Sequence, residues 1–236
     1  EEKNVKAIFQ GGADPSLTEV AFNSLANYEE AKNTDFVKVV SCNTTSLSRT
    51  LWSLDTNIGV EKAVANLVRR GGDPPQDSRG PINSIVPVTE IPSHHGPDVQ
   101  EVMPEMDITT LAVKVPTTIS HLHMVNVDLA KEVSREDVIR IFEETPRIRL
   151  FSAEKGYDST AKIIEKFRDQ RLRNDMPEVA VWKETVEVEN NTAYWIHQVH
   201  QESIIAPENI DAIRSMLGLA DKEESIRLTN ENMGLE

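Results

Sequence analysis

The 236-residue sequence has one cysteine, no long apolar run and few basic residues. A single cysteine excludes an intrachain disulfide framework and any zinc site built from several cysteines. Because no apolar run approaches the roughly 20 residues of a bilayer span, we expect a soluble, globular protein without membrane partners. The single cysteine favours a reducing, cytoplasmic setting. The 39 acidic residues outnumber the 25 basic ones and give a formal net charge of -14. This charge excludes nucleic acid as a default partner.

Glycine loops that cradle nucleotides are also missing. The ten glycines fit neither G-x-G-x-x-G nor G-x-x-x-x-G-K-S/T, and the sequence contains no internal repeat. The apolar patterns that are present predict an α+β fold around one mixed, largely antiparallel sheet, with a mostly loop-forming stretch at 74–104. We expect strands at 5–9, 37–40, 63–68, 109–115 and 121–129, a hairpin of runs 179–189 and 192–200 joined at Asn190-Asn191, and helices that start near residues 42, 134, 159, 207 and 222.

The helix predicted from Pro207 carries apolar residues at Ile210, Ile213 and Leu217 and is followed by Gly218. The spacing of these residues matches one face of a helix. The glycine is a typical residue just beyond a helix end.

Cys42 is the first candidate for chemistry. It lies between the β-branched run 37–40 and a helical pattern that contains Leu47, Leu51 and Leu54, so it is expected at a helix N-terminus. Unpaired amide hydrogens and the positive end of the helix dipole favour a thiolate there. A lone cysteine is more often a buried filler, but its polar neighbours pack poorly and donate hydrogen bonds well. We therefore expect an accessible, nucleophilic thiol with a lowered pKa.

The six histidines supply candidate proton carriers. His121 and His123 share one face of a predicted strand, so both can point towards the same pocket. His94 and His95 lie in a predicted loop between prolines, where their side chains are free to meet a ligand. For His197, on the last predicted strand, a structural role is the simpler interpretation. We expect no metal site, because His121-x-His123 has no carboxylate at a matching position.

A pair of arginines closes one predicted strand. Arg69 and Arg70 precede a Gly-Gly turn, a position from which guanidinium groups can bind an oxyanion through two hydrogen bonds each. Because the chain as a whole is acidic, an anionic substrate can bind only where basic residues lie close together, as Arg69 and Arg70 do. The thiol, a histidine and the two arginines together predict a site for a phosphorylated aldehyde.

Five short segments stand in an order that is typical of one enzyme family. They are 41–45 (SCNTT), 68–74 (VRRGGDP), 80–83 (GPIN), 92–99 (PSHHGPDV) and 116–118 (PTT), the last just before His121. In this order they resemble the archaeal type of phosphorylating glyceraldehyde-3-phosphate dehydrogenase. The likeness extends from 6–12 to 225–227 and covers nearly the whole chain. One departure is Ser46, where the resemblance leads us to expect glycine, and this serine is expected to perturb the turn after Cys42.

The resemblance implies an oxidoreductase of glycolysis and gluconeogenesis. Cys42 would add to the aldehyde of glyceraldehyde 3-phosphate, NAD or NADP would take the hydride, and inorganic phosphate would cleave the resulting thioester. His121 is implied as the general base, with His123 as the less favoured choice, and the protein is implied to be a homotetramer. The remaining implied roles are phosphate binding by Arg69, Arg70, His94, His95, Thr44 and Asn43, and cofactor binding by Asn27, Gln201, Gln10 and Gly11.

The glycine fingerprint that opens the family's Rossmann half has no counterpart here. The resemblance therefore implies that roughly the first hundred residues of that half are absent. We expect residues 1–40 to be its C-terminal remnant, 41–204 the catalytic domain and 205–236 helices that pack back on the nucleotide domain. Such a chain alone is expected to oxidise the aldehyde slowly or not at all. Two alternatives stay open: an enzyme similar to aspartate-semialdehyde dehydrogenase, and a non-catalytic interaction domain.

Overall fold

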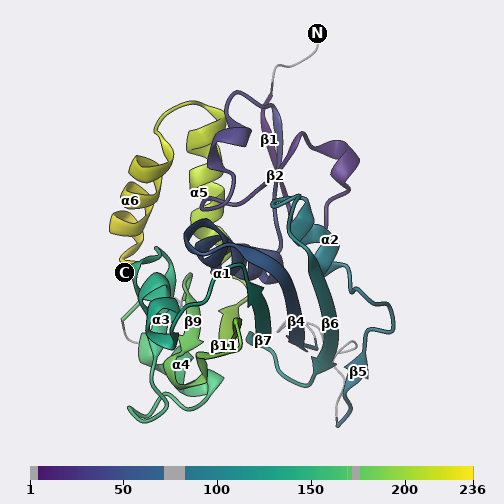
Figure 1. Ribbon diagram of the computed structural model, residues 1–236. Helices are drawn as coiled ribbons and strands as arrows, with labels where there is room; N and C mark the ends of the chain where they lie inside the picture. Colours follow the sequence, from purple (N-terminus) through teal and green to yellow (C-terminus); the bar gives the residue numbers. More distant parts are fainter. Residues whose placement is uncertain (1–4, 72–82, 169, 172–175, 236) are drawn as a thin grey trace.

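The N-terminal part of the chain forms a small parallel sheet (Figure 1). The structure, a computed structural model, describes residues 5–71, 83–168, 170–171 and 176–235. The strands lie in the order β1-β3-β2, and β1 and β3 confirm the first two predicted strands. Their bounds are β1 Ala7–Gln10, β2 Val20–Phe22 and β3 Phe36–Val39, with the short 3₁₀ helices η1 Pro15–Leu17 and η2 Tyr28–Ala31 between them.

A mixed sheet of eight strands forms the larger layer. Seven strands follow the order β5-β6-β4-β7-β11-β9-β8, and β10 pairs with β11. Neighbouring strands are antiparallel except in the pairs β4/β6 and β8/β9, which confirms the predicted α+β class. The strands are β4 Val60–Arg70, β5 Val86–Pro87, β6 Ile108–Val115, β7 Ser120–Leu129, β8 Ile148–Phe151, β9 Val179–Trp182, β10 Glu187–Glu189 and β11 Thr192–His200.

Three helices of the described chain begin directly after a capping serine. Ser41, Ser134 and Ser159 each accept a hydrogen bond from a backbone N–H of the first turn, and Ser134 forms a complete capping box with Asp137. No helix in the described part of the chain combines the length and apolar content of a bilayer span. The helices are α1 Cys42–Asn57, α2 His95–Gln100, α3 Arg135–Glu144, α4 Thr160–Phe167, α5 Ile205–Met216 and α6 Lys222–Met233, and η4 Lys183–Thr185 is a further 3₁₀ helix.

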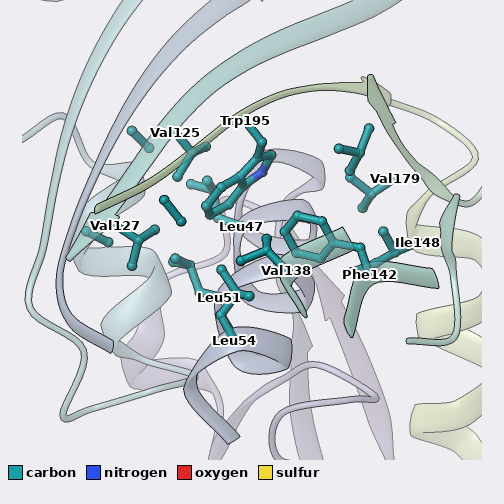
Figure 2. Close-up of a cluster of buried hydrophobic side chains, with 14 of the residues drawn as sticks. Leu47, Leu51, Leu54, Val125, Val127, Val138, Phe142, Ile148, Val179 and Trp195 are labelled. Atoms are coloured by element: carbon teal, nitrogen blue, oxygen red, sulfur yellow. The ribbon is translucent and has the colours of Figure 1, made fainter. Parts of the chain in front are cut away.

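Helix α1 packs across one face of the large sheet and fixes the position of its own N-terminus. Leu47, Leu51 and Leu54 are fully buried. Figure 2 shows them among side chains of β7, α3 and β11, including Phe142 and Trp195. Truncation of such a leucine to alanine typically costs about 2–5 kcal/mol, so this face holds α1 firmly in place.

The opposite face of the same sheet is only partly covered. At the β8/β9 end, Phe167 of α4 is buried against Phe151 and its neighbours. On the strands β6, β7 and β11, by contrast, Leu111, Met124 and Tyr194 remain exposed. The part of the sheet that the described residues leave uncovered therefore exposes apolar side chains.

Three predicted segments differ in detail from the structure. The run 179–189 is not one strand, because η4 separates β9 from β10. Both pair antiparallel with β11, and Asn190 and Asn191 adopt the expected positive φ of 48° and 67°. In the stretch 74–104, residues 95–100 form helix α2 rather than loop. The helix predicted at 159–172 ends at Phe167, and residue 172 lies outside the described residues.

The predicted helix from Pro207 is present as α5, and it buries polar side chains in place of some of its apolar ones. Ile213 and Leu217 are about half exposed, whereas Glu208 and Asp211 are completely buried. The helix turns its carboxylates inward because arginines far away in the sequence meet them there. A hydrophobic pattern carries no information about such partners.

These carboxylates belong to a charge network of Arg49, Arg147, Glu208 and Asp211, all with fully buried side chains. Arg49 Nη2 lies 2.7 Å from Glu208 Oε1, and Arg147 Nη2 lies 2.7 Å from Asp211 Oδ2. Ser24 donates to the second oxygen of Glu208 from its backbone N–H and its hydroxyl. The network thus ties the N-terminal segment, α1, the start of β8 and α5 together.

Candidate active site

A cavity of about 810 Å³ lies where the ends of β1 and β3 meet the N-terminus of α1 and the end of β4. Strand β7 and the first turn of α2 close its other sides. Of the residues predicted for the site, all except Thr44, Asn27 and the less favoured base His123 line this cavity. The lining includes Gln10, Gly11, Cys42, Asn43, Arg69, Arg70, His94, His95, His121 and Gln201.

Cys42 is the first residue of α1, directly after the capping Ser41, as predicted. Its Sγ lies 3.4 Å from Nε2 of His121. The predicted low pKa and exposure are wrong: the residue is 8% exposed, and burial raises the pKa of the thiol to about 11. The backbone N–H of Asn43 and the charges of Arg69 and Arg70 lower it, but desolvation outweighs them.

His121 faces the sulfur as a neutral imidazole. Burial, aided by the charges of Arg69 and Arg70, lowers its pKa to about 3. The backbone N–H of Arg70 donates to His121 Nδ1 at 3.0 Å. A neutral imidazole has one N–H, so the proton lies on Nε2 and points at Cys42 Sγ. At rest His121 is therefore a hydrogen-bond donor to the sulfur.

The two arginines have different surroundings. Arg70 is 5% exposed and donates to the carbonyl of Thr118 at 2.8 Å, to Glu202 at 2.9 Å and to the amide oxygen of Gln201. Arg69 Nε, by contrast, is buried without a hydrogen-bond partner in the part of the chain that the structure describes. Arg69 is thus the cation with donor capacity left for a ligand, while Arg70 is held by the protein.

The histidine pair is not in a loop, contrary to the prediction. The backbone N–H of Gly96 donates to Thr110 Oγ1 at 3.0 Å, which draws this segment onto β6, and α2 starts at His95. His95 is 1% exposed, and burial lowers its pKa to about 2. Neither of its ring nitrogens has a hydrogen-bond partner among the described residues. His94 is exposed, so only one of the two rings is open to a ligand.

His94, His95 and Asp98 place potential ligand atoms within 4.8 Å of one another. The positive charge of Arg69 acts on both imidazoles and opposes a cation at this position. Sequence analysis missed Asp98 and also Lys38, a buried lysine of β3 that lines the cavity and pairs with Glu101. The signal for Lys38 was a single charge inside a β-branched run.

Thr44 and Asn27 lie outside the cavity. Thr44 is fully buried, and its hydroxyl oxygen lies 2.9 Å from Ser41 Oγ at the helix cap. Asn27 donates to the carbonyl of Ala21 at 2.8 Å and accepts from the backbone N–H of Asn23. Both side chains are thus used by the fold rather than offered to a ligand.

The serine in place of the expected glycine leaves the chain direction unchanged. Ser46 lies within the continuous helix α1, and its hydroxyl donates to the carbonyl of Asn43 at 2.9 Å. The expected perturbation of the turn is therefore absent. The motif residues 72–74 and 80–82 lie outside the described residues.

Comparisons with known proteins agree on one family. The family model described as "Glyceraldehyde 3-phosphate dehydrogenase, C-terminal domain" matches residues 41–185. Proteins named glyceraldehyde-3-phosphate dehydrogenase are 50% identical in Archaeoglobus fulgidus and 53% identical in Thermococcus sibiricus, each over 236 residues. The relative from Methanothermus fervidus is 49% identical over 237 residues. These matches cover 99–100% of the chain and 69–70% of the relatives' length.

Proposed function

Because the chain belongs to the glyceraldehyde-3-phosphate dehydrogenase family, we propose that Cys42 is the nucleophile that attacks the aldehyde carbon of glyceraldehyde 3-phosphate. The family is one of NAD(P)-dependent oxidoreductases, and membership in it favours this function over the aspartate-semialdehyde alternative. The observation that carries the proposal is the 3.4 Å contact between Cys42 Sγ and His121 Nε2 at the wall of the cavity.

The first step forms a carbon–sulfur bond. The thiol loses its proton to solvent water that enters the cavity, and the thiolate adds to the aldehyde, whose π electrons move to oxygen and give a thiohemiacetal anion. The Nε2–H of His121 donates to the sulfur before the attack, and it lies close to the new oxyanion after it. The role of His121 as general base, implied by the resemblance, stays a prediction. The hydrogen bond on its Nδ1 favours a donor role in the resting site.

The ends of β1 and β3 offer a place for the nicotinamide cofactor. Ligands of parallel sheets bind at the carboxyl ends of the strands, and Gln10 and Gly11 line the cavity at the end of β1. Gly11 has a φ of +50°, which lets the backbone turn there. These residues would hold the nicotinamide end of NAD or NADP. When bound, the nicotinamide ring would accept the hydride. Gln201 instead holds Arg70 through its amide oxygen.

The thioester that remains after oxidation is cleaved by inorganic phosphate. A phosphate oxygen bonds to the acyl carbon, the carbon–sulfur bond breaks, and 1,3-bisphosphoglycerate leaves with Cys42 restored as thiolate. We assign phosphate binding to Arg69 and to the exposed His94. Their neighbours Arg70 and His95 are buried and act on the site through charge and packing.

We propose that the protein assembles as a homo-oligomer through the uncovered face of the large sheet. Leu111 on β6, Met124 on β7 and Tyr194 on β11 are exposed there, with β4 between β6 and β7. A second copy of the chain would bury this apolar surface. Sedimentation equilibrium of Met124→Glu beside the unaltered chain tests it, and an unchanged mass contradicts it.

A half-reaction that needs no cofactor tests the catalytic proposal. Acetyl phosphate acylates a nucleophilic thiol by the reverse of the phosphate step. We expect one acetyl group to form on the unaltered chain and none on Cys42→Ser. Equal acylation of both chains would contradict the role of Cys42.

A further inference from the structure

Four side chains form a continuous hydrogen-bonded chain from the hydrophobic core to the cavity, which we call the histidine relay. Trp195 Nε1 donates to His197 Nδ1 at 3.0 Å, His197 Nε2 lies 3.0 Å from His123 Nδ1, and His123 Nε2 lies 2.9 Å from Asn43 Oδ1. Each residue is at most 3% exposed. Figure 2 shows its inner end, where Trp195 packs near Phe142.

The direction of every hydrogen bond in this relay is determined. An indole N–H can only donate, so Nδ1 of His197 is an acceptor. Burial lowers the pKa of His197 to about 3 and that of His123 well below its usual value, so both rings are neutral. A neutral ring carries one proton. His197 therefore donates from Nε2 to His123 Nδ1, and His123 donates from Nε2 to Asn43 Oδ1.

The relay fixes the amide of Asn43. Its oxygen accepts from His123, so its nitrogen occupies the other arm of the amide plane. In the described part of the chain Asn43 Nδ2 donates no hydrogen bond. Asn43 lines the cavity directly beside Cys42. Its amide thus retains two hydrogens for a ligand.

We infer that Asn43 Nδ2 donates to the oxyanion that forms when Cys42 attacks a carbonyl, and that His123, His197 and Trp195 position it. The inference rests on the proposed role of Cys42. As the carbon–sulfur bond forms, the carbonyl π pair moves to oxygen, and the amide stabilises the negative charge there. No proton passes along the relay.

The same geometry removes His123 as a candidate base. Both of its ring nitrogens are engaged, with Ser46 Oγ an additional neighbour of Nδ1 at 3.3 Å. His123 is completely buried and does not line the cavity. It reaches the chemistry only through Asn43.

Two reagents separate oxyanion stabilisation from the reactivity of the thiol. p-Nitrophenyl acetate acylates Cys42 through an oxyanion and releases p-nitrophenolate. Iodoacetamide alkylates the same sulfur by direct displacement of iodide, without an oxyanion. For Asn43→Ala we expect acylation of the full chain to fall about 100-fold, with alkylation nearly unchanged. Asn126→Ala, on the outer face of β7, is the control and should alter neither rate.

His123 variants test the positioning role. His123→Leu removes the donor to Asn43, and we expect acylation to fall about tenfold, as for a misplaced oxyanion donor. His123→Gln keeps an N–H near Nε2 and should restore most of the rate. Trp195→Phe should give a smaller loss of acylation, because it removes only the N–H donor that fixes the tautomer of His197. In an Asn43→Ala background, His123→Leu should cause no further loss.

Three results would overturn the inference. The first is an equal fall of acylation and alkylation in Asn43→Ala, and the second is an undiminished effect of His123→Leu in the Asn43→Ala background. The third needs no variant: ¹⁵N NMR of the unaltered chain should show the proton on Nε2 of both His123 and His197, and a proton on either Nδ1 contradicts the relay. Reaction of Cys42→Ser with both reagents would instead contradict the proposed nucleophile.

Discussion

Helix α1 contributes to two buried polar clusters that differ in kind. Towards its N-terminus, Asn43 ends the histidine relay, which consists of neutral groups and stops at the cavity. Nearly two turns further on, Arg49 enters the charge network, in which two arginines meet two carboxylates. The relay leaves an amide donor open to a ligand, whereas the network is closed by its own counter-charges.

The difference separates positioning for chemistry from positioning for stability. A neutral relay has a direction, because each N–H needs an acceptor, so it can aim one group accurately. A buried charge network gains its strength from pairing, and breaking it leaves an uncompensated charge. We therefore expect variants of the network to unfold the protein, and variants of the site to change its reactivity.

Glu208→Ala should have the largest effect. It leaves Arg49 without its carboxylate partner in a fully buried position, and such a loss typically costs about 3–5 kcal/mol. Urea unfolding measures this cost. Glu136→Ala, an exposed glutamate of α3, is the matched control. A loss below about 1 kcal/mol, or a fall in Cys42 acylation under fully folded conditions, would break the distinction between the two clusters.

The pH dependence of Cys42 alkylation should show the next largest effect. Burial raises the pKa of this thiol to about 11 from an ordinary value of 9.0. Only the thiolate reacts, so the rate with iodoacetamide at pH 7 should be about 100-fold below that of an exposed cysteine peptide. The rate should rise until pH 11. A plateau below pH 8 would show that the helix end and the arginines outweigh desolvation.

Arg69→Gln tests whether the cavity binds the phosphate group of a substrate. Arg69 retains donor capacity and should bind the phosphate group of acetyl phosphate. We expect acylation by acetyl phosphate to fall about tenfold, the value of one charge-assisted hydrogen bond. The rate with p-nitrophenyl acetate, which has no phosphate, should change less. Arg168→Gln, an exposed arginine, is the control, and equal losses with both acetylating reagents would contradict phosphate recognition.

The smallest effect concerns stability in acid. The folded-state pKa of His95 is lowered to about 2, so its contribution is complete above the unfolded pKa of 6.5 and is lost as the pH falls from there. His95→Gln should reduce the slope of unfolding free energy against pH between 6 and 4 by about 1 kcal/mol per pH unit. The exposed neighbour variant His94→Gln should reduce it less. Identical slopes in all three chains would contradict a neutral, buried His95.

Local sequence patterns predicted the part of the fold that positions the site. The β-branched run before Cys42 and the leucines after it placed this residue at a helix N-terminus, and α1 begins there. Alternation from His121 onward gave the buried face of β7. These features depend on neighbours along the chain, so their patterns are visible in the sequence.

Features that depend on distant partners were not predictable. The inward face of α5 is set by Arg49 and Arg147, and the pKa of Cys42 is set by the whole surrounding core. His197 was interpreted as structural, and the sequence gives no indication that it connects to Asn43 through His123. Tertiary packing decides these contacts, and single-chain patterns do not encode it.

The role of Cys42 as nucleophile is tested most directly by observing the bond that its sulfur forms with the aldehyde carbon. Glyceraldehyde 3-phosphate labelled with ¹³C at the aldehyde carbon is mixed with the folded chain and followed by NMR without cofactor. If Cys42 is the nucleophile, we expect a new resonance of a saturated carbon bonded to sulfur and oxygen, which is absent with Cys42→Ser. A labelled carbon that stays free aldehyde and hydrate, or the same new resonance with Cys42→Ser, would contradict that role.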